Sequence, residues 1–223
     1  MRICHISDTH GELPLLKGKF DIIVHSGDIF PTLNAAPDRD VNKEIVFQRR
    51  WVYDNSDAIR KWFCNKPVLI IPGNHDYVVP AKLLAEIGVE AHDLTDTVVN
   101  IDGIRFYGFP YIHSTGANWA YERERGEEME KELDAMRDNI IKLVGCTSNI
   151  DALVAHAPLY GILDRMEGGQ KMGNSAINNE LLSIWSDLPS LYLHGHIHQG
   201  TGVSILHKML VSNSFMRNNI IEI

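Results

Sequence analysis

The sequence predicts an α/β fold whose β-structure contains both parallel and antiparallel strands. Short apolar runs that end in polar segments occur at residues 2–7 and 20–25, and residues 67–71 and 151–155 repeat this design. Helical patterns lie between these runs, and such alternation is typical of parallel sheets. Two strand-like runs at 97–101 and 104–109 are joined by Asp102-Gly103, which is a hairpin signal. Part of the β-structure must therefore be antiparallel.

The helices are predicted from apolar spacing and from residues that start or stop a helix. Apolar side chains recur at helical spacing over residues 45–63, and Pro80 and Gly88 mark the first turn and the end of a second helix. Steps of four and three predict a helix of about five turns with one apolar stripe, formed by Met129, Leu133, Met136, Ile140 and Leu143. A further helix is expected over 174–185, then a strand to Leu193 and short strands to Ile223.

The charged run at residues 122–132 is predicted to be a solvated helix face, interrupted by Gly126.

The chain has 223 residues, of which 44% are hydrophobic and 22% charged. These values exclude a disordered, collagen-like or disulfide-knotted chain. No internal repeat or linker is visible, so we expect one domain over residues 1–223.

Charge and cysteine content limit the classes of partner. The net charge of −8 disfavours nonspecific binding to nucleic acid, and no apolar stretch is long enough to cross a membrane. The three cysteines show no C-x-x-C spacing, which argues against a disulfide framework or a thiolate zinc site. No signal-peptide pattern is present, so a cytoplasmic location is expected.

Polar side chains with metal-binding chemistry follow the predicted strands. Asp8 and His10 are two residues apart after the first strand, and Asp28 follows Gly27 after the second. Side chains two apart on extended backbone project to the same side. The later members of the pattern are Asn74 in Gly-Asn-His-Asp, His156 before Ala-Pro, and His196 and His198 in Gly-His-Ile-His. Because open α/β sheets bind ligands at the carboxyl ends of their strands, we expect one shared metal site there.

The ordered motifs Asp-x-His, Gly-Asp, Gly-Asn-His-Asp, His and Gly-His-x-His resemble those of the calcineurin-like metallophosphoesterase superfamily from about Ile3 to His198. Longer phrases, such as Tyr-Gly-Phe-Pro at 107–110, resemble small metallophosphoesterase-domain proteins related to those of animal brain. The resemblance implies a four-layer α–β–β–α sandwich of two mixed sheets. It also implies two divalent transition-metal ions, with Mn favoured and Fe, Zn, Co or Ni as alternatives.

The resemblance further assigns each ligand. One ion would be held by Asp8, His10, Asp28 and His198, and the other by Asp28, Asn74, His156 and His196. Asp28 and a hydroxide would bridge the two ions, and this hydroxide would attack the phosphorus of a small phosphoester.

His75 is the candidate general acid, because a tight turn at Asn74 can direct its ring toward substrate. The predicted catalytic residues are therefore His75, Asp28 and Asn74. For Asp76 the sequence leaves two roles open, which are orienting a histidine and forming the turn.

The remaining histidines carry weaker signals. His5 and His25 are expected to be buried and hydrogen-bonded, and His194 is a candidate for contact with the ligands. His92, His113 and His207 have no supporting neighbours. Residues 111–121 are long enough to line the site, where Asn118, Trp119 and Tyr121 either contact substrate or form a core or rim.

Two features of related protein phosphatases are missing, and their absence favours a phosphodiesterase or a hydrolase of small phosphoesters, with phosphomonoesters as a further substrate class. Asp28 is followed by Ile-Phe-Pro, and Gly73 is preceded by Ile-Pro, so both phosphate-clamping arginines of those enzymes are absent. The alternatives are a protein phosphatase, a nuclease of the DNA-repair type and a protein-binding scaffold with little catalysis. The sequence leaves the natural substrate and the oligomeric state open.

Overall fold

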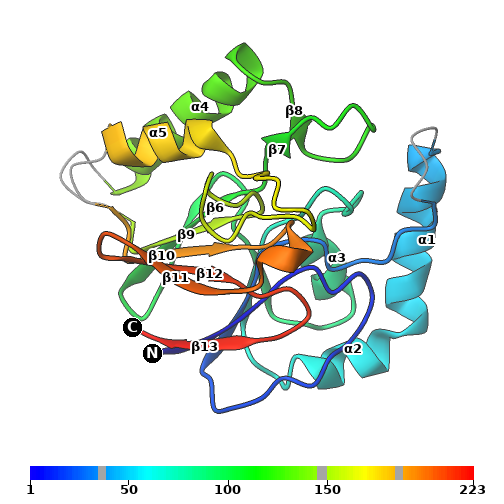
Figure 1. Ribbon diagram of the computed structural model, residues 1–223. Coiled ribbons are helices and arrows are strands. Elements are labelled where there is room, and N and C mark those ends of the chain that lie inside the picture. Colours follow the sequence, from blue (N-terminus) through cyan, green and yellow to red (C-terminus); the bar gives the residue numbers. More distant parts are fainter. Residues whose placement is uncertain (35–38, 145–149, 184–187) are drawn as a thin grey trace.

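The computed structural model describes residues 1–34, 39–144, 150–183 and 188–223, and in this part of the chain two large β-sheets stack face to face (Figure 1). The first has the strand order β13 (Asn219–Glu222), β1 (Arg2–Ile6), β2 (Ile22–His25), β3 (Val68–Ile70) and β4 (Ala91–Asp93). The second has the order β11 (Gly202–Leu206), β12 (Met209–Asn213), β10 (Leu191–His194), β9 (Ala152–Ala155), β6 (Ile104–Phe109) and β5 (Val98–Ile101). A short parallel pair is formed by β7 (Ile112–His113) and β8 (Glu122–Arg123).

Both large sheets are mixed, as the sequence predicts. In the first, β1 to β4 are parallel and β13 is an antiparallel edge strand. In the second, β6, β9, β10 and β12 are parallel, and β5 and β11 pair antiparallel at the edges. The predicted hairpin is confirmed, because Ile101 pairs with Ile104 around Asp102 and Gly103. Both turn residues have positive φ, at 50° and 87°, which suits the twist of a hairpin turn.

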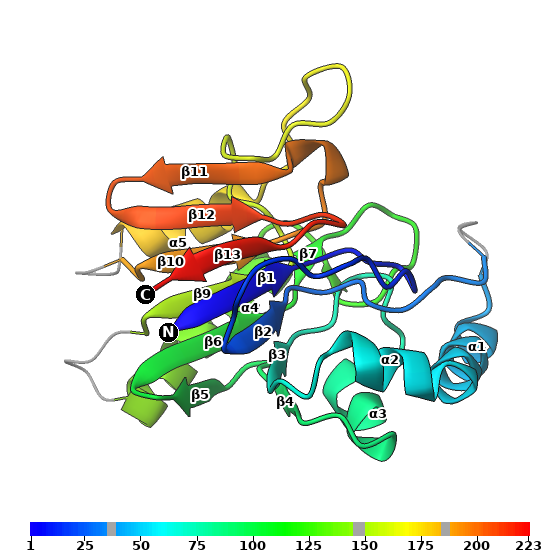
Figure 2. The same ribbon diagram turned by 90° about the horizontal axis from the view of Figure 1, so that it is seen from below.

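Helices cover the outer face of each sheet (Figures 1 and 2). The first sheet packs against α1 (Val41–Asp54), α2 (Ser56–Trp62) and α3 (Pro80–Glu86), through an apolar cluster that includes Val52 and Leu84. The second sheet packs against α4 (Glu127–Val144) and α5 (Ser175–Ser183), through a cluster that includes Met136 and Ile177. A third cluster, with Val24 and Val154, fills the space between the sheets. The four-layer α–β–β–α arrangement is therefore confirmed.

One predicted helix is divided in two. The pattern over residues 45–63 corresponds to α1 and α2, which are separated at Asn55. The Asn55 side-chain amide donates to the Trp51 carbonyl at 2.8 Å, and its backbone N–H donates to the same carbonyl at 3.0 Å. Asparagine favours such caps because its side chain competes for backbone hydrogen bonds.

The charged run at 122–132 is only partly helical. Glu122 and Arg123 belong to β8, Gly126 follows with φ of 83°, and α4 begins at Glu127. The Glu122 carboxylate accepts hydrogen bonds from the backbone N–H groups of Thr115 and Trp119 at 2.8 and 3.3 Å. The prediction of a solvated helix face was wrong for these first residues, because pairing with β7 and local hydrogen bonds fix them in a short strand and a turn.

The buried face of α4 contains Met129, Leu133, Met136 and Ile140, as predicted. The side chain of Leu143, together with Trp185 and Cys146, lies outside the described residues. The sequence pattern missed β4, which is only three residues long and has the polar sequence Ala-His-Asp.

The strand directions give the sandwich two different edges. The two chain termini lie side by side at one edge (Figure 1), and the Met1 amino group donates to the Ile223 carbonyl at 2.7 Å. The carboxyl ends of β1, β2, β3, β9 and β10 meet at the other edge, where their following loops come together. Among the helices that the structure describes, none is long and apolar enough to cross a lipid bilayer.

Candidate metal centre

The seven predicted metal ligands lie one to four residues beyond the carboxyl ends of five parallel strands. The first sheet supplies four of them, Asp8, His10, Asp28 and Asn74, and the second supplies His156, His196 and His198. The structure brings all seven into one cluster of contacts at the edge of the sandwich. Neither sheet alone contains a complete set.

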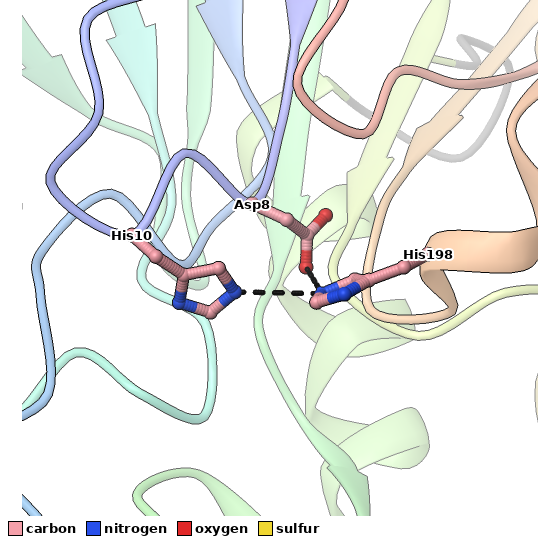
Figure 3. Close-up of side chains that lie close together, drawn as sticks. All are labelled: Asp8, His10 and His198. Atoms are coloured by element: carbon pink, nitrogen blue, oxygen red, sulfur yellow. Dashed lines mark hydrogen bonds and ion pairs between the residues drawn. The ribbon is translucent and has the colours of Figure 1, made fainter.

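One group of metal-binding side chains consists of Asp8, His10 and His198 (Figure 3). The Nε2 atoms of the two histidines are 3.4 Å apart, and His198 Nε2 lies 3.5 Å from Asp8 Oδ1. Asp8 is fully buried, whereas the two rings are half-buried. The His198 ring also stacks on Phe215, with centroids 3.9 Å apart, and this support was not predicted from the sequence.

A second group shares Asp8 and adds Asp28 and His156, all three of them buried. Asp28 Oδ2 lies 3.3 Å from His156 Nε2 and 3.9 Å from His10 Nε2, so this carboxylate lies between the two groups. Asn74 Oδ1 extends the second group, because it lies 3.0 Å from His156 Nε2 and 2.9 Å from His196 Nδ1.

Hydrogen bonds across the two sheets fix these side chains. His156 Nδ1 donates to the Ser26 carbonyl at 2.8 Å, which leaves Nε2 facing Asp28 and Asn74. The backbone N–H of His196 donates to both oxygens of Asp8 at 3.0 Å. A loop of each sheet is thus tied to a carboxylate or carbonyl of the other.

The electrostatics of the centre fit a bound cation. Burial by itself would raise the pKa of Asp28, but the adjacent His156 holds it well below its usual range. Burial would lower the pKa of His156, yet the Asp28 carboxylate raises it to about 9. Burial, with His156 nearby, lowers the pKa of His196 to about 3. A divalent cation fits among these groups, because it neutralises buried carboxylate charge and metal ligands must be deprotonated.

The backbone is strained at the same positions. Asp8, His10, Asp28 and His196 all have positive φ, between 45° and 66°. This left-handed region is uncommon for residues other than glycine, and such outliers concentrate at functional sites. The strain supports the interpretation that the loops are shaped to bring these side chains together.

Glycines beside the ligands allow the chain segments to approach. A Cβ atom at Gly195 would lie 2.0 Å from Asp8 Oδ2, and one at Gly73 would lie 2.2 Å from Asp28 Oδ1. At Gly27, which has φ of 102°, a Cβ atom would lie 2.6 Å from His156 Nδ1. These three motif glycines are needed for space around the ligands, and two of them, Gly73 and Gly195, have no positive φ.

Asp76 holds two of the loops together. Its buried carboxylate accepts hydrogen bonds from the N–H groups of Asp28 (2.8 Å), Phe30 (3.0 Å) and Gly73 (2.9 Å), and from Ile29 at 3.3 Å. Burial and the nearby Asp28 carboxylate raise the pKa of Asp76 to about 7, while the N–H donors oppose this rise. The turn role left open by the sequence is correct, but no contact with a histidine is seen among the described residues.

His75 lies beside the candidate ligands. Its backbone N–H donates to Asp28 Oδ1 at 2.7 Å, and its ring lies 4.8 Å from the His10 ring, centroid to centroid. The ring Nδ1 is 2.9 Å from Thr32 Oγ1, a partner that sequence reasoning missed. Trp119 packs against the ring at 4.0 Å, so the 111–121 segment does line this part of the site.

Two other histidines match their predicted structural roles. His5 bonds Ser212 and Ser26 at 2.8 and 2.9 Å, and His25 Nε2 contacts Thr9 at 3.2 Å, all buried. His194 is buried and contacts the Gly195 carbonyl, one residue before His196. Among the described residues, His92, His113 and His207 contact none of the candidate ligands. Tyr121 packs on Tyr111 with centroids 6.2 Å apart.

Two stacked mixed sheets with buried Asp, Asn and His side chains at their shared edge define a metal-binding α/β sandwich. The family model described as calcineurin-like phosphoesterase matches residues 1–200, and the chain belongs to this metal-dependent family. This confirms the resemblance identified from the motifs.

Several known proteins are similar to the chain. Metallophosphoesterase domain-containing protein 1 of Homo sapiens and of Mus musculus is 25% identical over 91% of the chain, which spans 62% of the length of these relatives. The DNA double-strand break repair protein Mre11 of Saccharolobus solfataricus is 31% identical over 44% of the chain and 24% of its own length. A solved archaeal phosphodiesterase shows 15% identity and a TM-score of 0.41, over 96% of this chain and 82% of its own.

The Gly195→Ala variant is expected to lose bound metal, because its new methyl group would overlap the Asp8 carboxylate. Metal content by elemental analysis and thermal unfolding of the purified variant test this. Gly126→Ala is the control, since nothing lies within 4 Å of its Cβ position. Its backbone strain costs about 1–2 kcal/mol and leaves metal content unchanged. Full metal content in Gly195→Ala would contradict the steric argument.

Asp76→Asn is expected to destabilise the protein by about 2 kcal/mol and to weaken metal binding, because an amide N–H₂ would then face backbone N–H donors. Denaturant unfolding and metal titration measure both effects. Asp54→Asn, at an exposed ion pair with Arg50, is the matched control. An Asp76→Asn variant as stable as this control would show that the carboxylate does not hold the loops.

Proposed function

We propose that this chain hydrolyses phosphodiester bonds with the help of two divalent metal ions. The observation that carries the proposal is the pair of histidine–carboxylate groups that share Asp8 at one sheet edge. Membership of the calcineurin-like phosphoesterase family supports it, because hydrolysis of phosphoric esters is the activity common to that family.

The proposed ligand sets follow the family motifs. Asp8, His10, Asp28 and His198 would hold one ion, and Asp28, Asn74, His156 and His196 would hold the other. The position of Asp28 Oδ2, within 3.9 Å of both His10 and His156, supports a shared carboxylate. Nitrogen and oxygen ligands of this kind accept Mn, Fe, Co, Ni or Zn, and Mn is our first proposal.

Ions bound here supply an activated water and neutralise charge on the phosphoryl oxygens. The chain itself supplies the rigid frame. Both carboxylates are buried and held by backbone N–H groups, so little reorganisation is needed when substrate enters. Asn74 and Asp28 act in catalysis by fixing the site at which the phosphoryl group binds.

The charge around the site supports a diester. Among the described residues, no Arg or Lys side chain forms a hydrogen bond or an ion pair with any of the candidate ligands. A phosphomonoester carries up to two negative charges near neutral pH, whereas a phosphodiester carries one. The diester therefore needs less positive charge from the protein.

His75 is proposed as the general acid that protonates the leaving oxygen. It lies next to Asn74 in the chain and within 4.8 Å of the His10 ring, but it belongs to neither metal-binding group. This position supports a role toward substrate instead of metal.

Two alternatives lead to different measurements. The match to Mre11 favours a nuclease, but a net charge of −8 opposes binding to a polyanion. A protein-binding scaffold would need neither ions nor turnover. The intact set of candidate ligands supports the enzyme over the scaffold.

A cytoplasmic location is also part of the proposal. Cys4 and Cys64 are free thiols, and the latter is exposed, which suits a reducing compartment.

Purified protein is expected to contain about two transition-metal ions per chain. It should hydrolyse bis-p-nitrophenyl phosphate faster than p-nitrophenyl phosphate, lose activity on chelation and regain it with Mn²⁺. Elemental analysis and initial rates measure these properties. Preference for the monoester would refute the diester assignment, and folded protein that stays inert with added Mn²⁺ would favour the scaffold.

His75→Ala is expected to lower kcat by about 10²- to 10⁴-fold while metal content stays as in the unaltered protein, because His75 donates a proton and holds no metal. Steady-state kinetics with elemental analysis test this. His207→Ala, at an exposed turn, is the control and should leave both quantities unchanged. Loss of metal in His75→Ala would assign His75 to the metal site.

A further inference from the structure

Thr32 lies beside His75, and no motif in the sequence predicts this contact. It follows Asp28 by four residues, and its Oγ1 atom lies 2.9 Å from His75 Nδ1. Within the described part of the chain, this hydroxyl is the hydrogen-bond partner of the His75 ring, and no carboxylate contacts the ring nitrogens. The ring nitrogen left for substrate is therefore Nε2.

The ring and its backbone are held from other sides as well. Trp119 packs against the ring with centroids 4.0 Å apart and an interplanar angle of 39°. The Arg39 guanidinium lies 3.2 Å from the Trp119 centroid. The His75 carbonyl accepts from Gln48 Nε2 at 2.6 Å, on the buried face of α1. The backbone is fixed and one ring face is packed, so the freedom that remains is rotation of the ring about its side-chain torsions. The hydrogen bond to Thr32 restricts this rotation.

We propose that Thr32 is a positioning residue for His75, and that its oxygen accepts from Nδ1–H, which leaves Nε2 to carry and give the proton for the leaving group. In this arrangement the neutral form of the ring is the Nδ1–H tautomer. The inference rests on the proposed function, in which His75 is the general acid.

A hydroxyl suits this role because its oxygen can accept from Nδ1–H both before and after the proton transfer. While the ring is doubly protonated, Nδ1–H donates to Thr32 Oγ1. As the bond between phosphorus and the leaving oxygen breaks, that oxygen keeps the electron pair and takes the Nε2 proton. The neutral ring that remains still carries the Nδ1 proton, so Nδ1–H goes on donating to Thr32 Oγ1 and the ring keeps its orientation. Water adds its oxygen to phosphorus, and one of its protons restores the ring, so atoms and charge balance.

The test compares Thr32→Val, which keeps the shape and loses the hydroxyl, with Thr32→Ser, which keeps the hydroxyl. Both are assayed on diphenyl phosphate, which has a poor leaving group, and on bis-p-nitrophenyl phosphate, which has a good one. A poor leaving group depends on proton donation, so Thr32→Val should lower kcat by about tenfold more on diphenyl phosphate than on the nitrophenyl ester. Thr32→Ser should restore most of this difference. Equal losses on both substrates would indicate a merely structural role and overturn the proposal.

A second readout does not depend on turnover. The ¹⁵N chemical shifts of the His75 ring, assigned by comparison with His75→Gln, report which nitrogen is protonated. We expect the Nδ1–H tautomer of the neutral ring in the unaltered protein and in Thr32→Ser, and a mixture of tautomers in Thr32→Val. Unchanged shifts in Thr32→Val would overturn the proposal. If the unaltered protein hydrolyses neither ester, the proposed function fails, and the shifts alone decide whether Thr32 sets the tautomer.

Discussion

The site depends on one buried carboxylate, that of Asp76, which organises the loops after β2 and β3. It accepts backbone hydrogen bonds from both loops, including the N–H groups of Asp28 and Gly73. Such N–H groups must find partners when they are buried, and a single carboxylate satisfies several of them. The loops therefore take one mutual arrangement, in which Asp28 reaches the His75 backbone at 2.7 Å.

The second constraint is the contact between the two sheets. Each sheet contributes only part of the candidate metal centre, so the apolar layer between them determines whether the parts meet. Above that layer, His156 bonds the Ser26 carbonyl and the His196 N–H bonds Asp8. Motif glycines at these crossings leave room that any side chain would fill. Packing in the core thus holds potential ligands from the two sheets at distances of 3 to 4 Å from one another.

Burial and charge then give the centre its chemistry. Two carboxylates are buried beside several imidazoles, and the described residues show no Arg or Lys ion pair with them. This arrangement is costly without a cation, which is the usual condition of a site prepared for metal. The His75 ring differs from these imidazoles, because the Thr32 hydroxyl and the Trp119 indole hold it.

The sequence by itself determined the fold class, the hairpin at Asp102-Gly103 and the identity of the candidate ligands. These follow from local periodicity and from polar residues placed after strands, both of which are readable one segment at a time. Only the tertiary structure decided which groups meet. Asp76 bonds the N–H of Asp28, 48 positions away, and Thr32 contacts His75, 43 positions away. Phe215 stacks on His198, which is 17 positions away. The division at Asn55 and the non-helical start of the charged run likewise depended on side-chain hydrogen bonds. Such contacts are set by how the loops pack, and no local pattern in the chain encodes that packing.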